Sequence, residues 1–108
     1  MKKNVIILGS TGSIGVNTLE VISIHLNKFR VFALAVNSSV ENLSIQCQKY
    51  DPQYAHVQKE EDAKKLISIL KKLNIKTEVL YGIKSLNQLV SLDEVDIVVC
   101  AISGSAGL

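Results

Sequence analysis

The residues of this chain best suited to chemistry are the glycines that follow its first apolar run. Gly9, Gly12 and Gly15 come directly after the apolar residues 5–8 and precede an amphipathic stretch, an order that predicts strand, turn and helix. Such a unit points the N–H groups of the turn and the positive end of a helix dipole at one spot, where a pyrophosphate fits. We expect Gly9 to form the tight turn, Gly12 to let a phosphate approach the backbone, and Gly15 to let the helix pack closely on the sheet.

The residues that follow the second predicted strand indicate whether the site would bind NAD or NADP. An NAD site usually places an acidic residue there, to bond the ribose 2′-hydroxyl. Here the strand is followed by Asn37, Ser38 and Ser39, and the first acid is Glu41. These three residues would not repel a 2′-phosphate and can donate hydrogen bonds to it, and the next helix adds a partial positive charge. The residues favour NADP over NAD; the alternatives are that Ser38 only caps the helix and that the glycine turn binds nothing.

The elements that must position these residues alternate along the chain. Nearly continuous apolar runs predict strands that helices cover on both faces, as in a parallel sheet. The predicted strands are residues 4–8, 30–36, 54–57 and 96–102, with a shorter one at 77–81. We therefore expect one α/β, Rossmann-like domain over residues 1–108, with a mostly parallel sheet and helices on both faces.

Helical periodicity separates these strands. The apolar stripes comprise Ile14, Leu19, Ile22 and Leu26; Leu43, Cys47 and Tyr50; and Ala63, Leu66, Ile67, Leu70 and Leu73. Pro52 closes the second helix. The pairs Ser38 with Glu41 and Ser85 with Gln88 have the spacing of a capping box, which predicts that helices start there.

Composition excludes several classes of protein. The chain has 108 residues, 47% hydrophobic and 20% charged, which is typical of one small globular domain. A net charge of +2 is too small to indicate nucleic-acid binding. No apolar run reaches the roughly 18 residues of a membrane span. Because a strand begins within about four residues, we expect no signal or transit peptide. Cys47 and Cys100 lack a CxxC spacing, so we expect buried free thiols and a cytoplasmic location.

Catalytic constellations are missing from the sequence. It has neither a P-loop nor a Tyr-x-x-x-Lys pair. We expect the isolated His25 and His56 to be surface or packing residues. The acidic group Asp93, Glu94 and Asp96 is expected to form a solvated loop opposite the ligand crevice. A second glycine-containing turn, residues 103–108, is expected to face the same crevice as the first.

The chain resembles the 1-deoxy-D-xylulose 5-phosphate reductoisomerases. The resemblance rests on residues 7–15 (ILGSTGSIG) with Thr18 and Leu19, on residues 29–34 and 50–55, and on the segment 95–108, which is similar to the family's AIxGxAGL turn. It covers the entire chain but only about the first quarter of a family member. It implies a Rossmann-like cofactor domain that is incomplete and inactive alone.

The resemblance implies an NADPH-dependent enzyme that converts 1-deoxy-D-xylulose 5-phosphate to 2-C-methyl-D-erythritol 4-phosphate in non-mevalonate isoprenoid biosynthesis. It also implies a sugar-phosphate substrate, a homodimer, no nucleic-acid or membrane partner, and Mg²⁺ or Mn²⁺ held by residues beyond Leu108. The NADPH phosphates would contact Thr11, Gly12, Ser13 and Ile14. The 2′-phosphate would lie near Asn37, Ser38 and Ser39, where many members have Gly-Lys-Asn and this chain has no lysine.

Two other interpretations remain open at this point. One is a non-catalytic NADP-binding module that senses the cofactor or regulates a partner. The other is an NADP oxidoreductase with the same glycine spacing, such as a semialdehyde dehydrogenase. That enzyme would need a catalytic cysteine, and Cys100, within a predicted strand, is a poor candidate.

Overall fold

The computed structural model describes residues 2–101, in which strands and helices alternate. The elements are β1 (Lys3–Leu8), α1 (Ser13–Ile24), β2 (Phe29–Ala35), α2 (Val40–Tyr50), β3 (Tyr54–Val57), α3 (Glu60–Lys72), β4 (Glu78–Tyr81), α4 (Ile83–Val90) and β5 (Ile97–Cys100). The first four strands begin and end within one residue of the predicted ranges. Strand β5 is shorter than the strand predicted at residues 96–102. Ile102 and the predicted turn at 103–108 lie outside the described residues.

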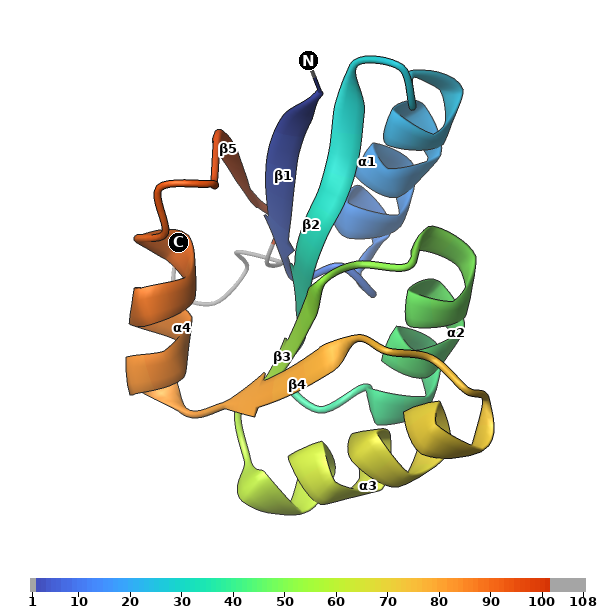
Figure 1. Cartoon of the computed structure of the whole chain (residues 1–108), viewed down its shortest axis with the longest axis vertical. Coiled ribbons are helices and arrows are strands. Elements are labelled where there is room, and N and C mark those ends of the chain that lie inside the picture. The colour runs from blue at the N-terminus through green and yellow to red at the C-terminus, as the bar shows by residue number, and fades with distance from the viewer. Residues whose placement is uncertain (1, 102–108) are drawn as a thin grey trace.

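The strands form one parallel sheet in the order β4-β3-β2-β1-β5. From β1 to β4 the chain steps outward one strand at a time. Helix α4 then carries the chain back across the sheet, and β5 pairs with β1 on its free side (Figure 1). The direction of strand addition therefore reverses at β1. In open α/β sheets, ligands bind at the carboxyl ends of the strands beside such a switch point.

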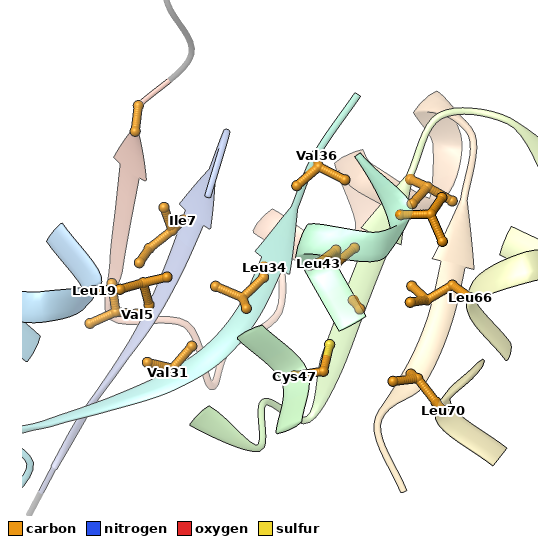
Figure 2. Packing of buried hydrophobic residues seen from close by; sticks show 14 of the residues in the cluster. Val5, Ile7, Leu19, Val31, Leu34, Val36, Leu43, Cys47, Leu66 and Leu70 are labelled. Atoms are coloured by element: carbon orange, nitrogen blue, oxygen red, sulfur yellow. The ribbon is translucent and has the colours of Figure 1, made fainter. Parts of the chain in front are cut away.

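Helices cover both faces of the sheet, as expected. Helices α1, α2 and α3 lie on one face and α4 on the other (Figure 1). This division follows from right-handed crossovers, because the direction of the connection reverses with α4. On the first face, buried residues of the sheet meet Leu19 of α1, Leu43 and Cys47 of α2, and Leu66 and Leu70 of α3 (Figure 2). A smaller cluster, around Ile6, Phe32 and Leu89, lies under α4.

The expectation that both cysteines are buried is wrong for Cys100, which lies in the edge strand β5. Cys47 is buried as predicted, but Cys100 is exposed, and both are free thiols. Ile97 and Val99 of β5 pack against the first core, so the alternation of the strand turns Val98 and Cys100 to the face that carries only α4. Val98 is accordingly 44% exposed.

Helices α2 and α4 begin within two residues of the predicted capping serines Ser38 and Ser85, but the observed N-cap residues are Ser39 and Gly82. Helix α2 begins at Val40 after Ser39, and neither Ser39 nor Gly82, the residue before α4, makes a side-chain capping hydrogen bond. Helix α4 begins at Ile83, two residues before Ser85, because Gly82 at φ 88° turns the chain directly out of β4. Some stripe residues are also exposed, and they lie at helix ends or on the flank of the stripe: Ile14, Leu26, Ile67 and Leu73.

Candidate functional site

The glycine turn between β1 and α1 is held against the end of β2. Gly9 has φ 85°, a left-handed conformation that favours glycine, which agrees with the tight turn expected there. The N–H groups of Gly9 and Ser10 both donate to the carbonyl of Ala35, at 2.7 and 3.2 Å. The first hydrogen bond of α1 runs from Val16 to the Gly12 carbonyl at 2.9 Å. The N–H groups that precede Val16 in α1 therefore have no partner within the helix.

Gly15 and Gly12 have different structural requirements. A Cβ on Gly15 would overlap the Gly9 carbonyl oxygen and lie 2.7 Å from the Ser10 Cα, so only glycine fits. The close packing predicted for Gly15 is thus made against the turn itself. A Cβ on Gly12 would lie 3.6 Å from the Gly9 oxygen and 3.7 Å from the Ala101 oxygen, an ordinary contact. The fold alone does not require glycine at this position.

A cavity of about 270 Å³ opens at the carboxyl ends of the strands. Its lining contains five of the eight residues predicted to bind cofactor: Gly9, Thr11, Gly12, Asn37 and Ser39. Much of the remaining lining comes from the ends of β2 and β3 and from α4, namely Ala35, Val36, His56 and Leu86. Ser13 and Ile14 stand in the first turn of α1 with exposed side chains. The switch point and the glycine turn thus share one polar-edged, otherwise apolar cavity.

A second cavity, of about 480 Å³, lies between the start of α2 and helix α3. Ser38 and Ser39 line it on one side, and Ser39 belongs to both cavities. Lys65 of α3 is the cation in its lining, whereas Glu41 and Asp62 contribute negative charge. The loop at Ser38 has no lysine, but Lys65 of α3 lines the same cavity as Ser38, and nothing in the local sequence motif indicates this.

Gln46 of α2 is a further residue that the motif did not reveal. The Ser10 hydroxyl donates to Gln46 Oε1 at 2.7 Å, and Gln46 Nε2 donates to the Ser10 carbonyl at 2.8 Å. Ser10 is fully buried, so this exchange satisfies its polar groups and fastens the glycine turn to α2.

His56, Asp96 and Cys47 have defined surroundings within the fold. His56 is buried, and its Nε2 lies 2.7 Å from the Gly82 carbonyl, so the expectation of a packing residue is confirmed. Asp96 accepts a hydrogen bond from the Asn4 backbone at 2.7 Å, which ties the start of β5 to β1. Burial raises the pKa of the Cys47 thiol to about 12, so Cys47 is not a nucleophile near neutral pH.

Residues 2–101 contain neither a cluster of metal ligands nor a helix that could span a membrane. No three His, Cys, Asp or Glu side chains are grouped so that they could hold a metal ion, so the described residues do not fit the divalent metal. No helix in the same part of the chain has the length and apolar character needed to cross a membrane.

The fold and the site together define a Rossmann-like α/β domain with its glycine turn at the topological switch point. The family model described as 1-deoxy-D-xylulose 5-phosphate reductoisomerase matches residues 5–108, and the chain belongs to that family. Relatives of that name from Nitrosospira multiformis and Saccharophagus degradans are 44% and 45% identical over 106 residues. Each comparison covers 98% of this chain and 27% of the relative, so the chain spans about a quarter of their length.

Solved structures agree with this assignment. A crystal structure described as DOX-P reductoisomerase in complex with NADPH, fosmidomycin and magnesium matches with a TM-score of 0.86 and 32% identity, over 93% of this chain and 24% of that one. The Zymomonas mobilis enzyme in complex with NADPH matches with a TM-score of 0.78 and 26% identity, over 87% of this chain and 24% of that one. The family assignment removes the semialdehyde dehydrogenase interpretation.

Proposed function

We propose that this chain is the NADPH-binding part of an enzyme that converts 1-deoxy-D-xylulose 5-phosphate to 2-C-methyl-D-erythritol 4-phosphate. The observation that carries the proposal is the position of the glycine turn, which faces a cavity at the switch point of the sheet. Two similar solved structures are described as complexes with NADPH. Residues 1–108 are proposed as an incomplete Rossmann-like domain, in keeping with a chain that spans 27% of its relatives.

The diphosphate of NADPH is assigned to the glycine turn. The free N–H groups at the start of α1, in Ser13 and Ile14, would donate to its oxygens, helped by the helix dipole. The hydroxyl groups of Thr11 and Ser13 add further donors. Gly12 supports this assignment because a Cβ there would occupy the space that the phosphates need, although the fold itself would accept it.

The adenosine 2′-phosphate is assigned to the loop after β2. Asn37, Ser38 and Ser39 offer hydrogen-bond donors, and no acidic residue precedes Glu41 in this loop. Lys65 supplies the positive charge from across the second cavity. Glu41 and Asp62 line the same cavity and weaken the field there, so the preference for NADPH over NADH depends on Lys65.

The rest of the proposed activity lies with groups that the described residues do not hold. When bound, NADPH supplies the hydride that reduces the aldehyde formed by the rearrangement. The divalent metal, Mg²⁺ or Mn²⁺, and the sugar phosphate are assigned to residues outside 1–108. The proposal includes a homodimer, and a cytoplasmic location that the free thiols Cys47 and Cys100 support.

Titration of the protein with NADPH and with NADH, followed by nicotinamide fluorescence, tests the proposal. We expect saturable binding that is tighter for NADPH. Gly12→Val should abolish binding by filling the space above the turn, whereas Ser23→Val, at an exposed position late in α1, should leave it unchanged. Unaltered affinity in a folded Gly12→Val protein would refute the assignment. The chain alone should bind NADPH without turning over 1-deoxy-D-xylulose 5-phosphate, because the metal and the sugar phosphate are assigned to residues outside 1–108.

A further inference from the structure

The buried ring of His56 reaches the cavity from the strand next to β2. His56 is 2% exposed and pairs in register with Ala35, the last residue of β2. It lines the 270 Å³ cavity together with the glycine turn, although nothing in the proposed reaction uses it. Most residues at this position in a parallel strand need only fill space, so a buried imidazole there calls for a physical explanation.

Hydrogen bonding fixes how the two ring nitrogens are used. The Gly82 carbonyl, 2.7 Å from Nε2, can only accept, so Nε2 carries the proton in the neutral ring. Nδ1 is then left with a lone pair and finds no partner among residues 2–101. Every fully buried side-chain nitrogen or oxygen in that part of the chain does have a partner. Nδ1 is therefore not sealed in the core, and the cavity is the space that His56 lines.

The path of a dinucleotide through this cavity indicates what meets that acceptor. With the diphosphate at the Gly9–Gly12 end and the adenosine ribose at the end of β2, the base lies on the far side of β2 from β1. That is the side of β3, where the cavity is lined by His56 together with Val36, Gln58 and Leu86. A mainly apolar pocket with a few polar groups, here the His56 ring and Gln58 on the β3 side, is typical of a ligand site.

We propose that His56 Nδ1 accepts a hydrogen bond from the 6-amino group of adenine, which makes His56 a residue that selects the base of the cofactor. The inference rests on the proposed NADPH site. Replacing the amino group with a 6-oxo group sets two acceptors against each other. A site with a directed acceptor rejects such an analogue, whereas a site that only packs against the ring does not.

The test compares NADPH with its hypoxanthine analogue, in which a 6-oxo group replaces the 6-amino group. For the unmodified protein we expect NADPH to bind about five to ten times more tightly, the fold-change of one neutral hydrogen bond. His56→Leu, which keeps the bulk and removes the acceptor, should bring this ratio close to one. His56→Asn, which keeps a polar atom near the position of Nδ1, should retain part of the discrimination.

The outcomes separate this inference from the proposed function. Failure of both nucleotides to bind would overturn the proposed function. Tight binding of both with equal affinity by the unmodified protein, or equal discrimination by a folded His56→Leu protein, would overturn the role of His56 alone. Should His56→Leu fail to fold, ¹⁵N NMR of the unmodified protein decides. The Nδ1 resonance should shift with NADPH and not in the same way with the analogue, and identical shifts would overturn the inference.

Discussion

Ser10 and Gln46 exchange two hydrogen bonds across the gap between the glycine turn and α2. The Ser10 hydroxyl donates to Oε1 at 2.7 Å and Nε2 donates to the Ser10 carbonyl at 2.8 Å, between residues 36 positions apart. The Ser10 N–H bonds the end of β2 at the same time. The turn assigned to the diphosphate and the loop assigned to the 2′-phosphate are thereby held as one unit.

Gln46→Ala should therefore weaken both the fold and the cofactor site. It leaves the buried Ser10 hydroxyl without its acceptor, which costs about 1–3 kcal/mol in the free energy of unfolding. Urea denaturation measures this loss, and NADPH titration should show a higher Kd because the turn is no longer fastened to α2. Gln48→Ala, the same change at an exposed position of α2, is the control. Equal effects of the two substitutions would show that the exchange with Ser10 contributes nothing.

Alanine at the two glycines of the turn should give opposite results. Gly15→Ala forces a Cβ into the backbone of Gly9 and Ser10, so we expect a loss of about 3 kcal/mol, at the upper end of overpacking costs. Gly12→Ala makes only ordinary contacts and should cost less than about 1 kcal/mol, as for a change at a helix N-cap. Thermal or urea unfolding checks the order. A Gly15→Ala protein as stable as Gly12→Ala would contradict the close approach of α1 to the turn.

The sequence predicted the strands of this protein better than it predicted the residues that line the candidate site. The apolar runs located all the strands, because burial on both faces leaves a continuous signal. The capping pair Ser38 and Glu41 placed the N-cap of α2 one residue before Ser39, which makes no side-chain capping hydrogen bond. Gln46, Lys65 and His56 were not identified as parts of the site. Their partners come from other elements, and a local motif carries no information about such contacts.

Lys65→Gln should reduce the preference for NADPH over NADH. An exposed ion pair contributes about 1 kcal/mol at most, so the Kd for NADPH should rise up to about fivefold, less at high salt. Binding of NADH, which has no 2′-phosphate, should stay the same. Lys64→Gln is a matched control because Lys64 is not part of the cavity lining. Asp62→Asn, which removes an opposing charge, should change the preference in the other direction. A uniform loss for both nucleotides would contradict the assignment of Lys65.

The buried thiol of Cys47 should make stability depend on pH in the alkaline range. Burial raises its pKa from an ordinary 9.0 to about 12, with a smaller increase from Asp51 and an opposing effect of the Thr77 hydrogen bond. Between these two values the unfolded chain has lost the thiol proton and the folded chain has kept it. The folded state then binds more protons, so the free energy of unfolding falls as pH rises through this window and is unaffected below it.

Comparison with Cys47→Ala isolates this contribution. All other ionisable groups are the same in both proteins, so their effects cancel in the difference between the two unfolding free energies. Below pH 9 the difference should be constant and should favour the wild type, because alanine leaves a small cavity in the core. From pH 9 upward the difference should shrink steadily as the wild type alone loses stability. A difference that stays level up to pH 11 would mean that the Cys47 thiol ionises as readily in the folded protein as in the unfolded chain, and that the core beneath α2 is open to water.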